Sequence, residues 1–261
     1  MASWEFPAEG PVQAEISLPA GSVHATATQT DTVTVSLESA SKSGERLLAE
    51  TEVSFDGGKL RVITPRRVSV FGNASLNLAI TLPAGSSVAA DTASADVTCH
   101  GDMGGLSGKT ASGDVDAERV GGDVDFSTAS GDVELAETTG DVRVSTASGD
   151  LTVGRAGGEI IAKTASGDVR IGAAGQSATV KTASGDVRID RVSTGLADAT
   201  TVSGDIVIAV APEVGVYLDV STLSGDAASE LDSSGSAEGE AGLTISCRSV
   251  SGDVRITRAS R

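Results

Sequence analysis

Residues 128–150 read TASGDVELAETTGDVRVSTASGD, and this stretch carries the pattern that decides the fold. Ser-Gly-Asp occurs near both of its ends at an interval of 18 residues, and a weaker copy, Gly140-Asp141, stands halfway between. Further halfway copies are Gly122-Asp123, Gly158-Glu159 and the degraded Gln176-Ser177, so the repeat unit is nine residues, paired into 18. The complete tripeptide occurs eight times, at Ser112–Asp114, Ser130–Asp132, Ser148–Asp150, Ser166–Asp168, Ser184–Asp186, Ser203–Asp205, Ser224–Asp226 and Ser251–Asp253.

The repeat predicts which side chains face a core. Apolar residues stand one and three positions after the aspartate, as Val133 and Leu135 do, and alanine stands three before it. These positions share one parity, so on a strand they point to one side, and the threonine, serine and aspartate point to the other. Because nine is odd, the alternation must slip once per repeat, and pairs such as Glu118-Arg119 and Ser127-Thr128 predict a corner four and five residues after the aspartate.

Identical columns that recur every 18 residues bury a continuous core only if successive coils stack. The pattern therefore predicts an all-β protein, a parallel β-solenoid or β-helix with about 18 residues per coil built from paired nonapeptides. Such coils stack about 4.8 Å apart.

The regular repeat divides the chain into three parts. We predict an N-terminal β-rich cap with wide coils over residues 1–95, a regular Ser-Gly-Asp solenoid over 96–205, and irregular C-terminal coils over 206–261 with a mobile loop at 229–241. An echo of Ile16–Ser22 at Ile80–Ser86 indicates the wide coils. Within the cap we expect a short helix at Gly44–Glu50 and strands at Val12–Leu18, Val33–Leu37, Glu52–Phe55, Leu60–Ile63 and Leu76–Leu82.

Composition excludes several classes of protein. The chain has 261 residues with 36 acidic and 19 basic side chains, a formal charge of −17. Such acidity argues against a nucleic-acid partner, which needs lysine and arginine to neutralise phosphate. No apolar run is long enough to span a membrane. The start, MASWEFPAEG, lacks the basic and apolar segments of a signal peptide, so we expect a cytoplasmic protein, with an extracellular location as the alternative.

The Leu-Pro-x-Gly segments that lead into strands, followed by repeats of Thr-x-Ser-Gly-Asp-Val-x-Ile type, resemble the bacterial β-strand-repeat proteins labelled "putative adhesin". The resemblance covers nearly the whole chain and is clearest from about Leu76 onward. It implies a solenoid or β-helix fold. The family is a domain of unknown function, so the resemblance carries over no catalytic residues, cofactor or partner.

The aspartate column is the first candidate site. Stacked carboxylates repel one another by about 1 kcal/mol in water at coil spacing, so something must compensate. Structural calcium would do so, yet the Gly-Gly-x-Gly-x-Asp pattern of calcium-binding repeats does not occur in the sequence. We therefore expect each carboxylate to accept backbone N–H groups at its bend, with Arg143, Arg170, Arg188 and Arg255 screening the charge. The column comprises Asp114, Asp132, Asp150, Asp168 and Asp186.

A second candidate is the hydroxyl ladder, two predicted outward columns of threonine and serine. Regular threonine rows could order water as ice-binding surfaces do, but β-propensity and turn bonding account for them more simply. The pairs are Thr92/Ser94, Thr110/Ser112, Thr128/Ser130, Thr146/Ser148, Thr164/Ser166, Thr182/Ser184, Thr201/Ser203 and Thr222/Ser224.

The remaining reactive residues predict no catalytic, cofactor-binding or metal site. His24 and His100 lie far apart in the sequence, with no matching cluster for zinc or for a nucleophile. Cys99 falls on the inward column, so we expect it to be a small core residue, and we expect Cys247 to be a reduced residue on a strand; the redox state of both does not follow from the sequence.

These observations predict a non-enzymatic β-solenoid that binds or scaffolds a protein or an extended polymer through repeated surface columns. End-to-end self-association would follow if a terminal coil is uncapped. The alternatives are a calcium-stabilised, adhesin-like surface protein and a carbohydrate-active β-helix enzyme, which would need paired carboxylates in a groove.

Overall fold

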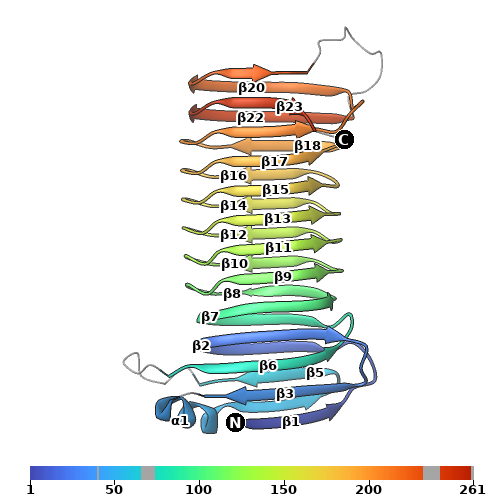
Figure 1. Ribbon diagram of the computed structural model, residues 1–261, viewed down its shortest axis with the longest axis vertical. Helices are drawn as coiled ribbons and strands as arrows, with labels where there is room; N and C mark the ends of the chain where they lie inside the picture. The colour runs from blue at the N-terminus through green and yellow to red at the C-terminus, as the bar shows by residue number, and fades with distance from the viewer. Residues whose placement is uncertain (40, 66–73, 232–241, 260–261) are drawn as a thin grey trace. The chain divides into compact units, whose positions relative to one another are not determined.

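The computed structural model describes residues 1–39, 41–65, 74–231 and 242–259. The chain forms two compact units, Met1–Val133 (unit 1) and Glu134–Arg261 (unit 2), and each is described by itself. Figure 1 shows that both are built from short strands stacked in successive coils. The predicted all-β parallel solenoid is confirmed.

Unit 1 begins with antiparallel strands and continues with parallel ones. On one face, β1 pairs antiparallel with β3, and β3 with β6; the second half of β2 then runs parallel to β6 and β7, and β7 to β9. On the other face, β4 pairs antiparallel with β5, and the order continues in parallel through the first half of β2, β7, β8 and β10. The elements are β1 (Ala2–Pro7), β2 (Gln13–Thr28), β3 (Thr32–Glu38), α1 (Lys42–Glu50), β4 (Glu52–Asp56), β5 (Lys59–Ile63), β6 (Leu76–Pro83), β7 (Ser87–Met103), β8 (Gly105–Lys109), β9 (Val115–Val120) and β10 (Val124–Ser127).

The strands β2 and β7 are long, and they pair in register from Gln13↔Ser87 to Ala27↔Gly101. The two echo segments occupy different places, because Ile16–Ser22 lies inside β2 while Ile80–Ser86 ends β6 and turns toward β7. The expected helix is present as α1. Its N-cap is Ser41, whose hydroxyl accepts the N–H of Gly44, and Leu47 is buried.

Unit 2 is more regular until its last coils. β13 pairs in parallel with β15, β15 with β17 and β17 with β19 on one face, while β12, β14, β16 and β18 pair on the other. The elements are β11 (Val133–Thr138), whose first residue belongs to unit 1, β12 (Val142–Ser145), β13 (Leu151–Ala156), β14 (Ile160–Lys163), β15 (Val169–Ala174), β16 (Ala178–Lys181), β17 (Val187–Val192), β18 (Gly195–Thr200), β19 (Ile206–Val210), β20 (Val216–Ser224), β21 (Ala227–Ser229), β22 (Leu243–Ser251) and β23 (Val254–Arg258).

The last coils of unit 2 do not stack in chain order. β22 pairs with β18 on one side and β20 on the other, and β23 pairs with β19 and β21. The final segment of the chain is thus inserted before the coil that precedes it, as Figure 1 shows for β22, β23 and β20. The predicted loop at 229–241 begins at the end of β21, and its residues 232–241 lie outside the described residues.

The core includes the two columns predicted to face inward, one and three residues after the aspartate, and a third column six residues after it, as at Val120 and Val192. Val115, Ala117, Val133 and Leu135 show the pattern, each at most 2% exposed. Phe126 takes the same inward position and is 1% exposed.

The prediction for the alanine and threonine columns was wrong. Alanine three positions before the aspartate is exposed, as at Ala129 and Ala165, whereas Thr128 and Thr182 before it are 8% and 6% exposed. Two successive outward residues therefore occur at Ala129-Ser130 in this half of the coil, while the predicted corner at Glu118-Arg119 holds in the other half. At Thr128 the physical reason is that its Oγ1 accepts the N–H of Gly131 at 2.9 Å, whereas the Thr182 hydroxyl is buried without a hydrogen-bond partner among the described residues.

The glycine of each Ser-Gly-Asp turn is required by close stacking. A Cβ on Gly131 would overlap the carbonyl oxygen of Gly113, and one on Gly167 would overlap that of Gly149. Glycine therefore lets the backbones of neighbouring coils approach each other at the turn.

Candidate functional site

A groove of about 730 Å³ lies on the outer face of unit 1, over β5, β2, β7, β8 and the start of β10. It is built from the outward residues of adjacent strands. The strand register places Arg61, Glu15, Ala89, Ser107 and Asp125 in one row across the sheet. All five line the groove.

A second row, one step along the strands, repeats the arrangement. Lys59, Gln13, Ser87 and Gly105 follow one another in register, and Asp123 lies next to Gly105 because Val124 pairs with Leu106. Both rows therefore have long side chains at one end, small ones in the middle and aspartates at the other end. The small residues of β7 and β8 form the floor of the groove.

The wall on β2 and β5 is held by ion pairs. Glu15 Oε2 lies 2.9 Å from Lys59 Nζ and 3.0 Å from Arg61 Nε. The side-chain hydrogen bond from Lys59, and then that from Arg61, hold the pKa of the Glu15 carboxyl below its usual value. This wall is thus a fixed charge cluster, while Asp123 and Asp125 make the opposite wall acidic.

The groove was not predicted from the sequence. Its residues alternate outward along five strands, but the pairing of β2 with both β5 and β7 joins segments about 45 and 75 residues apart. The only sequence signal is the alternation of polar residues in Gln13–Ser17 and Lys59–Ile63, which does not reveal which strands are neighbours.

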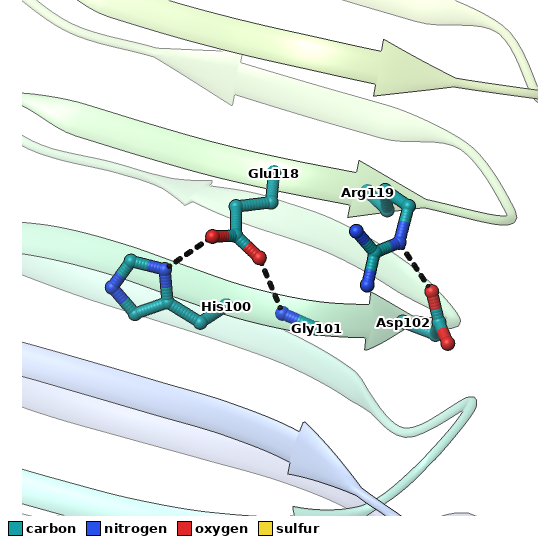
Figure 2. A network of polar contacts seen from close by, with 5 residues as sticks. All are labelled: His100, Gly101, Asp102, Glu118 and Arg119. Atoms are coloured by element: carbon teal, nitrogen blue, oxygen red, sulfur yellow. Dashed lines mark hydrogen bonds and ion pairs between the residues drawn. The ribbon is translucent and has the colours of Figure 1, made fainter.

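A second polar cluster lies on β7 and β9 (Figure 2). The Glu118 carboxylate accepts the N–H of Gly101 at 3.0 Å, and His100 Nδ1 lies 3.1 Å from its other oxygen. The Gly101 N–H, and then His100, hold the pKa of Glu118 below its usual value. Beside it, Arg119 Nε donates to Asp102 at 2.6 Å. These contacts tie β9 to the end of β7, where the register shifts between Cys99 and Asp102.

The structure brings the two histidines closer than the sequence indicates. His24 pairs with Thr98 across β2 and β7, and Thr26 pairs with His100, so the histidines are diagonal neighbours on one outer face. No three His, Cys, Asp or Glu side chains in the described ranges are grouped so that they could hold a metal ion.

The aspartate column forms a ladder along the coils. In unit 1, Asp96 accepts the backbone N–H of Asp114 at 3.0 Å, and Asp114 accepts that of Asp132 at 2.9 Å. In unit 2 the acceptor is always the Oδ1 of the neighbouring coil's aspartate, at 2.8 to 2.9 Å. The bonds there run from Asp168 to Asp150, Asp186 to Asp168, Asp205 to Asp186, Asp253 to Asp205 and Asp226 to Asp253.

The expected bonding of carboxylates to backbone N–H groups is therefore present, and it crosses from one coil to the next. The expected screening by arginine takes another form. Arg170 and Arg188 both pair with Asp190, at 3.0 and 2.5 Å, and Arg143 pairs with Asp141 at 3.4 Å.

The predicted hydroxyl ladder is not a pair of outward columns. The serines Ser112, Ser130 and Ser148 are exposed, but the threonines turn inward, as Thr128 does. The flat threonine surface that ice binding would need is thus missing from this column in the described coils. The hydroxyls instead lie against the turn, where Thr110 and Thr128 accept glycine N–H groups.

Both cysteines are free and fully buried, and for Cys99 the burial was expected from its place on the inward column. Burial, with a smaller contribution from Asp116, raises the pKa of the Cys99 thiol to about 12. Burial, with Asp198 and Asp219, does the same for Cys247. Both side chains are therefore protonated at neutral pH, which disfavours redox chemistry.

In the part of the chain that the structure describes, no helix has the length and apolar character needed to cross a membrane. Comparison with curated proteins finds no match. Among solved structures, a "putative lipid binding protein" from Parabacteroides distasonis is 15% identical, with a TM-score of 0.53 over 98% of this chain and 96% of that one. A "putative adhesin" from Bacteroides fragilis is 11% identical over 98% and 96% of the two chains, with a TM-score of 0.46.

The first of these similarities shows a shared fold and, at that identity, nothing beyond the fold. The sequence profile of the family described as Toastrack DUF4097 matches residues 13–260, which is nearly the whole chain. This protein therefore belongs to the Toastrack DUF4097 family.

Proposed function

We propose that this protein is a non-enzymatic binding or scaffold module, and that the groove of unit 1 holds an extended, basic segment of a partner protein. The observation that carries the proposal is the two-row arrangement of the groove. A floor of Ser87, Ala89, Gly105 and Ser107 leaves room for a chain laid between two polar walls.

The charge of the lining favours a basic partner. Four carboxylates, Glu15, Asp91, Asp123 and Asp125, face the groove against the two basic groups of Lys59 and Arg61. Glu15 offsets the charge of these two basic groups only in part. Asp91, Asp123 and Asp125 add three negative charges, so the field that an incoming segment meets is negative. Lysine or arginine side chains of the partner would reach Asp123 and Asp125.

An apolar ligand fits this lining less well, because the outward side chains of both walls are charged or polar apart from Ile63 on β5. A carbohydrate-active site needs a carboxylic acid with a raised pKa beside a second carboxylate, usually through burial. The aspartates of the groove are exposed. A panel of polysaccharides that yielded reducing ends or unsaturated products would contradict the non-enzymatic proposal.

The first test uses defined peptides. Fluorescence polarisation with labelled oligolysine and oligoglutamate should detect binding of oligolysine only, weakened by salt. The double variant Asp123→Asn, Asp125→Asn should lower this affinity by at least about tenfold. The matched control is Asp116→Asn on the other face of the unit, which should leave it unchanged. Equal binding by both variants would overturn the proposal.

The second test identifies the partner. A photo-reactive amino acid at Ser107, on the groove floor, should capture a protein with a basic extended segment from a lysate of the native host. The same group at Thr98, on the opposite face, should not capture it. Capture of the same protein from both positions, or binding that persists in the double variant, would contradict the assignment of the groove.

A further inference from the structure

In the stack of unit 2, the outermost coil is formed by β20 and β21, and one edge of β20 has no partner strand among the described residues. β20 pairs with β22 in parallel from Val216↔Leu243 to Ser224↔Ser251, and β21 pairs with β23. No other strand of the described residues pairs with the opposite edge of β20. Such an edge presents backbone N–H and C=O groups that can pair with another chain.

The core is also open at this coil. Leu243, Ile245 and Cys247 of β22 are completely buried, yet their partners in register, Val216, Leu218 and Val220, are only half-buried. Apolar side chains that would face the next coil therefore meet solvent. Covering this end of the unit would bury them, which is favourable in free energy.

Large apolar residues also appear on the outside of this end. The exposed residue before each Ser-Gly-Asp serine is alanine through the regular coils, for example Ala165 and Ala183. In the last three coils of the stack it becomes Val202, Val250 and Leu223, which are 52%, 45% and 83% exposed. On β20 itself, Tyr217 is 63% exposed.

The arrangement of these residues on β20 is self-complementary. Tyr217 and Leu223 both lie three residues from Val220, and all three stand on a strand with one unpaired edge. We propose that a second copy of this chain binds at this end, with the two β20 strands antiparallel and Val220 opposite Val220. This register sets each Tyr217 against the partner's Leu223 and joins the two open cores.

Charge is compatible with this register and disfavours one alternative. Asp219 then stands opposite the partner's Ser221, and its own carboxylate already pairs with Arg248 at 3.2 Å. A register centred on Asp219 would set two carboxylates opposite each other, which is destabilising. A two-fold pairing of identical edges closes on itself, so the assembly stops at a dimer.

The association test uses the full chain in sedimentation velocity over a wide range of concentrations, and a monomer–dimer equilibrium is the expected result. Leu223→Lys should weaken the dimer by at least about tenfold. The matched control Ala165→Lys, in the same exposed column of an inner coil, should leave it unchanged. Circular dichroism melts show whether each variant folds. A monomer at all concentrations, larger species that grow with concentration, or a dimer insensitive to Leu223→Lys would overturn the proposal.

The register test uses single cysteine variants, since both native thiols are buried. Tyr217→Cys protein mixed with Leu223→Cys protein should form a covalent dimer on mild oxidation, and neither alone should do so. Efficient cross-linking of either variant to itself, or none in the mixture, would contradict a register centred on Val220.

Discussion

The segment Thr-Ala-Ser-Gly-Asp folds with two different hydrogen-bond patterns in the two units. In unit 1 the N–H of Gly131 donates to the hydroxyl of Thr128 within the same turn. In unit 2 the N–H of Gly167 donates to the carbonyl oxygen of Ser184 in the neighbouring coil, at 3.1 Å. The hydroxyls of Thr146, Thr164 and Thr182 are then buried without a hydrogen-bond partner.

The difference shows that the same repeat sequence gives the same path of the chain with different hydrogen bonds closing the turn. Two acceptors lie within reach of the glycine N–H, and either one satisfies it. Two features are the same in both units, namely the glycine against the preceding coil and the aspartate ladder. These shared features should therefore matter most for stability, and the threonine should matter where its hydroxyl has a hydrogen-bond partner, as Thr128 does, and not at Thr146, Thr164 or Thr182.

Removing the glycine should have the largest effect. In Gly167→Ala the new Cβ would overlap the backbone carbonyl of Gly149, which cannot move without breaking the stack. We expect a loss of about 3 kcal/mol or more of unfolding free energy, measured by urea denaturation. Gly215→Ala is the control, since a Cβ there meets no atom within 4 Å, and it should be neutral or slightly stabilising.

Loss of a hydrogen bond of the aspartate ladder should have the second largest effect on stability. Asp168→Ala removes the acceptor for the N–H of Asp186 and should cost about 1–2 kcal/mol. Asp168→Asn keeps an oxygen acceptor and removes a charge, so its stability should stay within about 0.5 kcal/mol of wild type. Urea denaturation of the two variants compares them directly, and equal losses would show that the charge rather than the hydrogen bond matters.

Replacing threonine by valine should change stability differently at Thr128 in unit 1 and at Thr182 in unit 2. Thr128→Val removes the acceptor of the Gly131 N–H and should destabilise by about 1 kcal/mol. Thr182→Val replaces a buried hydroxyl that has no partner, so it should be neutral or stabilising by about 0.5 kcal/mol. Thermal denaturation of the two variants tests the contrast, and the same sign for both would contradict the two patterns.

The Glu118 cluster should give a small, pH-dependent effect. Its pKa is held below the ordinary value of 4.5, so the carboxylate contacts stabilise above that pH and are lost as the pH falls through the lower, folded value. Titration followed by NMR should place the Glu118 midpoint below 4.5. Glu118→Gln should flatten the acid side of the stability profile, and an unchanged profile would argue that the contacts contribute nothing.

Calcium should have no effect. Because one oxygen of each ladder aspartate is engaged by a backbone N–H, we propose that the coils need no cation to offset the stacked charge. Millimolar calcium and a chelator should leave the melting temperature unchanged. A steep rise with calcium and unfolding by the chelator would instead support the calcium-stabilised alternative.

Much of this architecture could be predicted because the repeat encodes it locally. The inward columns at Val133 and Leu135 follow from parity alone. That the aspartates accept backbone N–H groups was expected from their place at a bend, although each accepted N–H belongs to the neighbouring coil. The inward turn of Thr128 could not be read from parity, because a hydrogen bond to Gly131 overrides the alternation there.

The groove and the order of the last coils depend on long-range pairing. Nothing local indicates that β2 lies between β5 and β7, or that β22 is inserted between β18 and β20. In the sequence, Asp123 and Asp125 look like ordinary repeat positions, because no local pattern shows which strands lie beside them. In the folded sheet they form one wall of a groove. Local patterns thus predicted the scaffold, and the candidate binding surfaces lie where the pattern is interrupted.

The central claim is that each repeated aspartate closes the turn of the neighbouring coil and is not a ligand-binding column. Amide hydrogen exchange at Asp186 tests it most directly, since its N–H donates to Asp168 Oδ1 at 2.8 Å. We predict slow exchange in the wild type and in Asp168→Asn, and exchange at least about tenfold faster at Asp186 in Asp168→Ala, without calcium present. Unchanged protection of Asp186 in Asp168→Ala, or protection that requires calcium, would contradict the account.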